Sequence, residues 1–439
     1  MKLPLLITGV FLMISNTFFA QRATFKDMDN YFDKLSENGK MMGSVSIFFQ
    51  DSTLYSKSIG YSDVDSKNLI NVDTKFRVGS ITKTYTAALV LKAVEEGRLK
   101  LTDRLNSFYP EVKNADRITI EQLLKHRTGI FNFTDIDGQD RWEQEYHTEK
   151  EFLNYFTDQE SNFEPDTDFE YSNTNYALLG FILQKIYGIG FADILKMKIT
   201  DPLQLKNTYF SNEVDPSKNE ALSYNIQNKF IRNAQVNYAN HRSGGGITST
   251  PTEVNKFLTA LFNGQIISKE SLKLMLPQER GTYGMGIQML NSATDIYEHS
   301  GRVENFISDY WYFPNEELGV VVLTNAVNIE IGEVVMEMVG FAYGNKPVIP
   351  DFNLIEGITS ADFLKIKGTY VKNDGETITI SSNGKYLVFQ SSEIGQMFVP
   401  FVNKGNNVFE YEDVRLTFYP KENNVFFEQS GVQEFFKKI

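Results

Sequence analysis

The chain has 439 residues, a formal net charge of −13 at pH 7 and no cysteine. This length suits two or three domains, each with a core of its own. A chain without cysteine has no disulfide, thiolate zinc site, cysteine nucleophile or lipidated N-terminal cysteine, and its acidic balance argues against nucleic acid as a partner.

Residues 1–20 have the pattern of a secretory signal peptide. Lys2 supplies the positive end, and an apolar run over 3–13, too short to span a bilayer, precedes a plausible cleavage region before Gln21. Phe18 is larger than the small residue usual at its place, so the cleavage position stays open, and an uncleaved anchor is the alternative. No later segment is long and apolar enough to cross a membrane, so we expect an exported protein, periplasmic or secreted.

Residues 21–343 form the predicted first domain. Short β-type runs lie near both of its ends, and helical patterns lie between them. The runs cover 44–49, 54–59, 309–313 and 319–323, and a closing helix is predicted at 331–342. This order predicts an α+β domain whose one antiparallel sheet is completed by the two ends.

The most informative stretch of this domain begins at Gly79. Ser80 precedes an apolar run to Glu96, which is typical of a helix buried on all sides. The backbone N–H of Ser80 would lie in the positive field of that helix start, and Lys83, three residues on, would share its face. A partly desolvated lysine can act as a base, so the turn offers a nucleophile, a base and one oxyanion donor.

This Ser-x-x-Lys spacing is not specific alone, because Ser382 to Lys385 repeats it. That copy carries Asn-Gly between β-type runs and predicts a hairpin turn. A second element, Tyr171-Ser172-Asn173, precedes an apolar helical run at 176–186. A tyrosine beside a lysine cation can lose its proton more easily and serve as a general base, so Tyr171 joins the candidates.

Other residues that could carry chemistry give weaker signals. His126 could be a catalytic base, but a hydrogen bond to the backbone at a helix end is favoured. Four histidines without paired spacing predict no metal site, and the glycines at 244–246 lack the strand-then-helix layout of a nucleotide cradle, so no cofactor is predicted. The irregular stretch 131–170 is either a lid or surface decoration, and 212–242 is expected to be loop-like.

The C-terminal part has a different pattern. After a linker at 344–359, residues 360–439 carry about eight short alternating runs, separated by turn signals such as Asn373-Asp374-Gly375. This spacing predicts a small antiparallel barrel or sandwich. The β domain carries no catalytic constellation, although it could partly cover a neighbouring cleft.

Five motifs in order resemble the serine β-lactamase and penicillin-recognising family, in particular its class C-type branch of esterases, D-amino-acid-releasing peptidases and related hydrolases. The resemblance covers roughly 24–343 and implies a β-lactamase/transpeptidase-like domain with an antiparallel sheet, flanking helices and a helical subdomain. The matching motifs are 76–83, 123–129, Tyr171-Ser172-Asn173, 244–251 and His299-Ser300-Gly301.

The resemblance also implies a set of roles. Ser80 would attack an acyl carbon, Lys83 and Tyr171 would share the proton transfers, and water would hydrolyse the acyl-enzyme. The backbone N–H groups of Ser80 and Arg302 would form the oxyanion hole. His299 would polarise or orient the substrate.

Asn173 and Gly301 would support the catalytic groups or the substrate. Many family members have lysine where this chain has His299, whose positive charge at neutral pH is less certain. This difference weakens the expectation of a substrate carboxylate. An ester, amide or D-amino-acid peptide is therefore favoured as the small-molecule or peptide substrate, with a true β-lactamase or D-Ala-D-Ala carboxypeptidase as the alternative.

An alternative of another class is a catalytically silent protein that binds a ligand or peptidoglycan. The acyl pocket would then be vestigial, or the β domain would dock the ligand. The complete set of Ser80, Lys83 and Tyr171 argues against it. The pattern predicts no oligomeric state.

Overall fold

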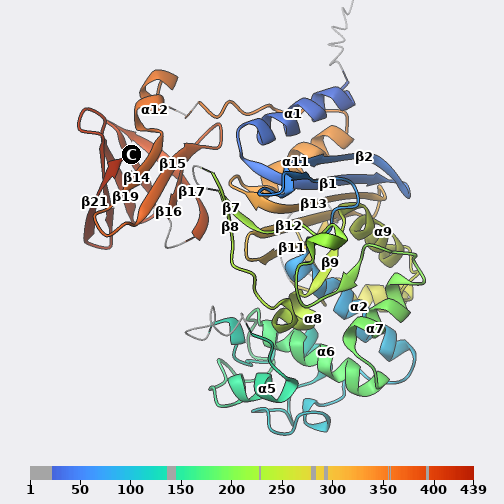
Figure 1. Ribbon diagram of the computed structural model, residues 1–439. Coiled ribbons are helices and arrows are strands. Elements are labelled where there is room, and N and C mark those ends of the chain that lie inside the picture. The colour runs from blue at the N-terminus through green and yellow to red at the C-terminus, as the bar shows by residue number, and fades with distance from the viewer. Residues whose placement is uncertain are drawn as a thin grey trace, which may run out of the picture.

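The computed structural model describes residues 22–439 except 136–144, 227–228, 278–282, 291–294, 354, 356 and 392–394 (Figure 1). The predicted signal peptide at 1–20 lies outside the described residues. In the part of the chain that is described, no single helix has the length and apolar composition to cross a membrane. Only a pair bent by 78°, Asn173–Tyr187 with Phe191–Thr200, meets that test together.

A six-stranded antiparallel sheet is the frame of the first domain. Its order is β10-β11-β12-β13-β1-β2, so the first and last parts of the domain meet where β1 pairs with β13. This arrangement confirms the predicted sheet. The strands are β1 (Met41–Phe49), β2 (Ser52–Ile59), β10 (Gln288–Met289), β11 (Tyr297–Val303), β12 (Phe306–Phe313) and β13 (Leu318–Val327).

Helices cover both faces of this sheet (Figure 1). On β13, Val320 and Val322 pack with α1 (Phe25–Glu37) and α11 (Ile331–Ala342), whereas Val321 and Leu323 belong to the larger core on the opposite face. All ten residues of β13 are buried, as expected for a strand covered on two sides. The larger core holds α2 (Thr82–Glu95), which carries the first motif.

The remaining elements of the first domain form a helical subdomain and small sheets. The helices are α3 (Ile120–Leu124), α5 (Glu149–Thr157), α6 (Asn173–Tyr187), α7 (Phe191–Leu195), α8 (Arg242–Gly245), α9 (Pro251–Phe262) and α10 (Lys269–Met275), with a π-helical turn at Lys196–Thr200. The short strands are β3 (Tyr61–Asp63), β4 (Asn68–Leu69), β5 (Phe76–Arg77), β6 (Tyr209–Phe210), β7 (Tyr224–Ile226), β8 (Phe230–Arg232) and β9 (Ile247–Ser249). Single 3₁₀ turns are η1 (Gly79–Ile81), η2 (Leu105–Ser107), η3 (Phe133–Asp135), η5 (Pro216–Lys218) and η6 (Tyr238–His241).

Two segments differ from the sequence-based expectation. The loop-like stretch 212–242 contains the hairpin of β7 and β8, whose strands of three residues are too short for a visible alternation. The irregular stretch 131–170 contains α5, begun by a capping box between Thr148 and Glu151. Three apolar residues of α5 are buried, so this part of the stretch is core rather than decoration.

The C-terminal strands close into an eight-stranded antiparallel barrel. The barrel closes at β14, which pairs with β15 on one side and with β21 on the other. Of the two predicted alternatives, the structure is therefore a barrel and not a sandwich. Gly384, in the turn after β15, has φ +100°, as the predicted hairpin requires. The elements are α12 (Ser360–Ile366), β14 (Gly368–Val371), β15 (Thr377–Ser382), β16 (Leu387–Ser391), β17 (Gly395–Gly405), β18 (Val408–Tyr411), β19 (Val414–Tyr419), β20 (Asn424–Gln429) and β21 (Val432–Lys438).

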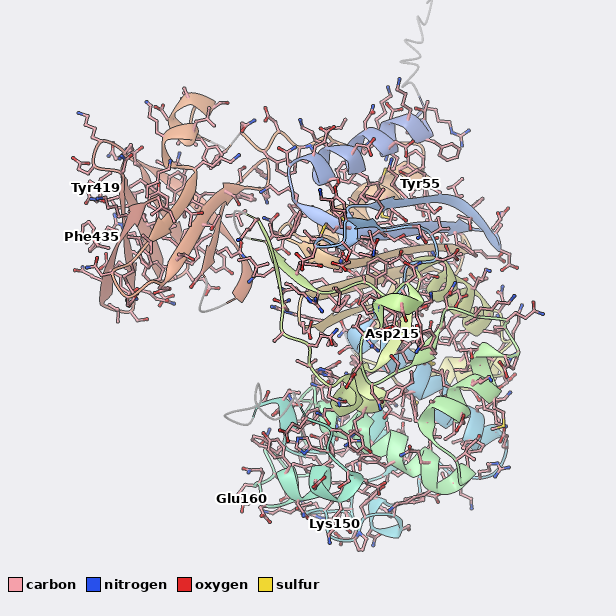
Figure 2. All side chains as sticks on the ribbon, in the orientation of Figure 1. Tyr55, Lys150, Glu160, Asp215, Tyr419 and Phe435 are labelled. Atoms are coloured by element: carbon pink, nitrogen blue, oxygen red, sulfur yellow. The ribbon has the colours of Figure 1, made fainter. Side chains whose placement is uncertain are left out.

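The side-chain alternation of the barrel is clearest on β21. Phe436 points into the barrel core at 2% exposure, while Phe435 is 57% exposed and stacks with Tyr419 on the outside, far from the six-stranded sheet (Figure 2). On the opposite side, the Gln390 amide donates a hydrogen bond of 2.7 Å to Asn225 Oδ1 of β7. This bond joins the barrel to the first domain at the β7–β8 hairpin. The assignment of residues 344–359 as the linker between the two domains remains a prediction.

Candidate active site

Ser80 lies on η1, the turn that leads from β5 into α2, and glycines let this turn approach β11. Gly79 has φ +51°, and a Cβ there would lie 2.6 Å from the backbone nitrogen of Arg302. A Cβ on Gly301 would lie 2.2 Å from the carbonyl oxygen of Val78 and 2.9 Å from the backbone nitrogen of Ser80. Only glycine fits both positions, and the backbone N–H groups of Ser80 and Arg302 meet at this contact.

Lys83 is fully buried beneath Ser80. Its Nζ lies 3.0 Å from Ser80 Oγ, 2.8 Å from Asn173 Oδ1 and 2.8 Å from the carbonyl oxygen of Gly244. Burial lowers the pKa of Lys83 well below its usual value, because desolvation disfavours the charged ammonium. The lowered pKa makes the neutral form, with two hydrogens and one lone pair, easier to reach.

The partners of Lys83 fix how that amine is used. Asn173 Oδ1 and the Gly244 carbonyl can only accept, so they take the two hydrogens. The third hydrogen-bonding position of Nζ faces Ser80 Oγ, to which Nζ donates at 3.0 Å. In the deprotonated amine this position holds the lone pair, which then faces the Ser80 hydroxyl. The amide of Asn173 is held in this orientation, since its nitrogen donates to Thr134 Oγ1 at 3.3 Å. Lys83 is thus arranged to accept a proton from Ser80.

Tyr171 covers the other side of Lys83. Its ring centroid lies 4.8 Å from Lys83 Nζ, and its hydroxyl is hydrogen-bonded to Ser80. Burial raises the pKa of Tyr171, against the expectation that a lysine cation would ease its ionisation. The physical reason is that desolvation of the buried phenol penalises its charged form, and this is the largest cause of the shift. Tyr171 is therefore protonated in the resting site.

His126 supports the Tyr171 segment from below. It is fully buried, and its Nδ1 accepts a hydrogen bond of 3.1 Å from the backbone N–H of Ser172. Its ring lies 4.4 Å from that of Tyr171, and burial lowers the pKa of His126 well below its usual value. The favoured interpretation, a histidine bonded to backbone, is confirmed.

His299 on β11 has both ring nitrogens bonded. Nδ1 lies 2.6 Å from the Ser300 carbonyl, which can only accept, so Nδ1 carries the proton. Nε2 is then an acceptor, and the hydroxyl of Tyr283 donates to it at 3.1 Å. Burial and the nearby Lys83 lower the pKa of His299 to about 3, so the ring is neutral at pH 7. The sequence left the positive charge of His299 at neutral pH uncertain, and its surroundings here favour the uncharged ring.

The three sequence motifs thus meet at one place, with Ser80, Lys83, Tyr171, Asn173 and His299 drawn from η1, α2, the start of α6 and β11. Within the described ranges, no group of three or more His, Asp or Glu side chains is placed to hold a metal ion.

Comparison with known proteins identifies the family. A family model described as beta-lactamase matches residues 28–332 of the 439. The chain belongs to the beta-lactamase family. Among curated members, Protein flp of Staphylococcus aureus (strain MW2) is 27% identical over 320 residues, which cover 68% of this chain and 63% of that protein. The chain therefore matches less than two thirds of that relative's length.

Two solved structures share the fold. The octameric penicillin-binding protein homologue from Pyrococcus abyssi has a TM-score of 0.65 and 22% identity, covering 94% of this chain and 99% of that one. D-amino acid amidase from Ochrobactrum anthropi SV3, complexed with L-phenylalanine amide, has a TM-score of 0.59 and 23% identity, covering 69% of this chain and 91% of that one. The β-lactamase/transpeptidase fold followed by a barrel is the architecture of this family member.

Two groups at the site were not identified from sequence. The Gly244 carbonyl binds Lys83 from 161 residues away, and its only signal was the triple glycine, which allows a close backbone approach. The Tyr283 hydroxyl binds His299, and its signal was a tyrosine beside Gly284 and Gly286, just before a strand. Neither pattern names its partner.

Proposed function

We propose that this beta-lactamase family member is a serine hydrolase that forms an acyl-enzyme at Ser80. The proposal rests on the hydrogen-bonding of Lys83, a buried amine of lowered pKa that is bonded to Asn173, Gly244 and the Ser80 hydroxyl. When this amine is neutral, Asn173 and Gly244 hold its hydrogens and its lone pair faces Ser80. A serine beside a positioned base is the arrangement that activates a hydroxyl nucleophile.

Acylation follows from these contacts. Ser80 Oγ bonds to the acyl carbon while its proton passes to Lys83 Nζ. The charge that develops on the acyl oxygen is held by the backbone N–H groups of Ser80 and Arg302. The acyl–leaving-group bond then breaks, and Tyr171, which is protonated at rest, gives its proton to the leaving group.

Lys83, now an ammonium, returns a proton to Tyr171, so the two groups titrate as a coupled pair. In deacylation, water adds to the acyl carbon and gives its proton to the same pair. The bond to Ser80 Oγ breaks, and Oγ takes a proton back from Lys83. The carboxylic acid leaves and the resting site is restored.

The substrate class follows from His299. A neutral imidazole with both nitrogens bonded gives no cation for a substrate carboxylate next to the scissile bond. We therefore propose an ester, amide or D-amino-acid peptide substrate rather than a β-lactam or a D-Ala-D-Ala terminus. The fold shared with a D-amino acid amidase is in keeping with an amide. In this proposal the uncharged ring of His299 orients the substrate by contact. Asn173 supports Lys83, and Gly301 supports the oxyanion hole.

A substrate panel tests this proposal. The purified chain and its Ser80→Ala variant are assayed with p-nitrophenyl acyl esters, D-amino-acid p-nitroanilides, a chromogenic cephalosporin and a D-Ala-D-Ala peptide. Turnover of esters or D-anilides at least about 100-fold above the Ser80→Ala variant, in line with nucleophile loss, is expected. Preference for the cephalosporin or the D-Ala-D-Ala peptide would refute the proposed substrate class.

We also propose that the protein is exported, because residues 1–20 carry a signal-peptide pattern. Expression of the full chain with a C-terminal tag, followed by fractionation and intact-mass measurement, tests it. Loss of about the first 20 residues is expected, and a full-length cytoplasmic product would contradict export.

A further inference from the structure

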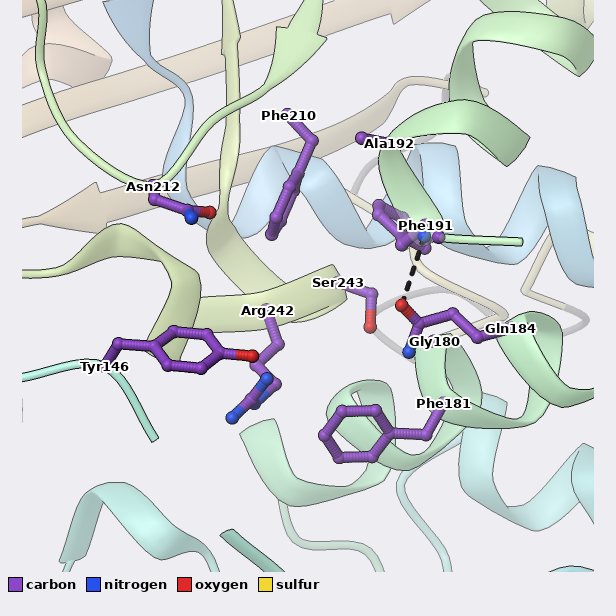
Figure 3. A pocket seen from close by; sticks show the side chains of 11 residues that line it. Tyr146, Gly180, Phe181, Gln184, Phe191, Ala192, Phe210, Asn212, Arg242 and Ser243 are labelled. Carbon is purple, nitrogen blue, oxygen red and sulfur yellow. Dashed lines mark hydrogen bonds between the residues drawn. The ribbon is translucent and has the colours of Figure 1, made fainter. Parts of the chain in front are cut away.

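A pocket of about 320 Å³ lies outside the candidate active site, between α6, the start of α7, β6 and α8 (Figure 3). Four aromatic rings line it, from Tyr146, Phe181, Phe191 and Phe210. Aromatic walls with a few polar groups are typical of small-molecule sites. None of the proposed catalytic residues lines this pocket.

Arg242 is the one charged side chain among the lining residues. It is 9% exposed, one of its terminal nitrogens donates to the His147 carbonyl, and its guanidinium lies over the rings of Phe152 and Phe181 at 4.9 and 4.8 Å. Within the described part of the chain, no carboxylate lies within ion-pair distance of it. The side chain of Tyr146, which also lines the pocket, is hydrogen-bonded to Arg242. Glu149 acts on it only at longer range and is bonded to Tyr109 and Lys185.

Further hydrogen-bond donors lie around the same space. The Oε1 of Gln184 accepts from the backbone N–H of Phe191 at 3.2 Å, which leaves its amide nitrogen on the pocket side (Figure 3). Asn212 adds an exposed amide at the rim. The lining residues include no Asp or Glu, although the chain as a whole carries a net charge of −13.

We propose that this pocket binds a small monocarboxylate with an apolar, preferably aromatic, body. The rings would enclose the body, and the Arg242 fork would take the carboxylate, because a desolvated cation without an anionic partner gains most from one. A single arginine matches one negative charge, which favours a monocarboxylate over a phosphate dianion.

The pocket is joined to the candidate active site through the next two residues of the chain. Ser243 lines the pocket, and its Oγ and carbonyl are bonded to the Tyr176 carbonyl and to Thr86 Oγ1, each at 2.6 Å. Gly244 then offers its carbonyl to Lys83 Nζ at 2.8 Å. An occupant that shifts Arg242 would therefore act on Lys83. This consequence for activity, unlike the binding itself, rests on the proposed function.

Calorimetric titration tests the binding, with phenylacetate as the probe and phenylacetamide as its neutral analogue. The protein carries Ser80→Ala, so that hydrolytic chemistry does not contribute. We expect saturable phenylacetate binding, and phenylacetamide weaker by about tenfold or more, as expected for a hydrogen-bonded charge pair. Equal binding of the two probes, or no saturable binding of phenylacetate, would overturn the proposal.

Two pocket variants and one control locate the site. Arg242→Met removes the charge, and Ala192→Phe fills the pocket from an exposed lining position, which protects the test against misfolding at Arg242. Met197→Phe adds bulk at a position on the following turn that is 44% exposed and outside the lining. Binding should be lost in both pocket variants and kept in Met197→Phe. Binding kept in Ala192→Phe places the probe elsewhere and refutes the proposal.

The outcomes separate this inference from the proposed function. Binding of phenylacetate, together with no acylation of Ser80 in the unmodified protein, would refute the hydrolase alone. Acylation of Ser80 without phenylacetate binding would refute the pocket alone.

Discussion

The hydroxyl of Tyr283 donates a hydrogen bond of 3.1 Å to Nε2 of His299. Because the Ser300 carbonyl holds the proton on Nδ1, this bond leaves the imidazole with no free nitrogen. Direct polarisation of a substrate by His299 would first have to break it. The third motif of this family member is therefore a neutral, fixed ring, and its neighbour Tyr283 determines that state.

The Tyr283→Phe variant tests this relationship. Loss of the hydroxyl leaves Nε2 of His299 unpaired, which should cost about 1–3 kcal/mol of unfolding free energy. Imidazole ¹⁵N shifts should show the Nδ1–H tautomer in the unmodified protein, and a changed Nε2 shift in the variant. An Nε2–H tautomer in the unmodified protein would contradict the assignment.

Lys83→Arg tests the role of the lone pair. Arginine keeps the positive charge but cannot be deprotonated at working pH, so it cannot accept the Ser80 proton. We expect kcat with the preferred ester to fall by about 1,000-fold, within the range for loss of a general base. A variant that keeps a tenth of the activity would show that Lys83 is not the base.

The pH dependence of stability follows from the lowered pKa of Lys83. The unfolded chain binds a proton at Lys83 up to its ordinary pKa of about 10.4, whereas the folded chain releases it at lower pH. Stability therefore rises with pH between the two pKa values, with a slope of at most about 1.4 kcal/mol per pH unit. Denaturant unfolding at pH 7 and 9 should show that the unfolding free energy of the unmodified protein rises with pH relative to that of Lys83→Met. An unchanged difference would contradict the lowered pKa of Lys83 in the folded protein.

Gly301→Ala tests the contact between η1 and β11. The added Cβ would meet Val78 O at 2.2 Å and Ser80 N at 2.9 Å, so the two oxyanion N–H groups must move apart. A loss of about 100-fold or more in kcat is expected, as for removal of an oxyanion donor.

Gly332→Ala is the matched control for Gly301→Ala. It lies in α11, and a Cβ there meets nothing within 4 Å. It should leave kcat unchanged and stabilise the helix by up to about 1 kcal/mol. An equal loss in both variants would point to general destabilisation.

The sequence predicted those parts of the molecule that local pattern determines. The largely apolar run after Ser80 became α2, a helix in which 11 of 14 residues are buried, and Gly97 at its end has φ +68°. The eight alternating runs of the C-terminal part became the eight barrel strands, because period-two alternation and turn residues are local signals. The three catalytic motifs were placed by resemblance, and the structure brings them together.

The rest depended on contacts between distant segments. A backbone carbonyl such as that of Gly244 has no side-chain signature, so its bond to Lys83 was invisible. The protonation state of Tyr171 was expected from one neighbour, whereas burial of the whole site sets it. Arg242 gave no signal at all, because its importance comes from the rings and the pocket around it.

The most direct test of the account is intact-mass measurement after exposure to a fluorophosphonate serine-hydrolase probe, repeated with a penicillin and a p-nitrophenyl ester. The unmodified chain should gain the mass of one phosphonyl group at Ser80, Ser80→Ala should gain none, and Lys83→Arg should react far more slowly. A folded, unmodified chain that gains no mass from any of the three reagents would contradict an activated serine and favour a silent binding protein.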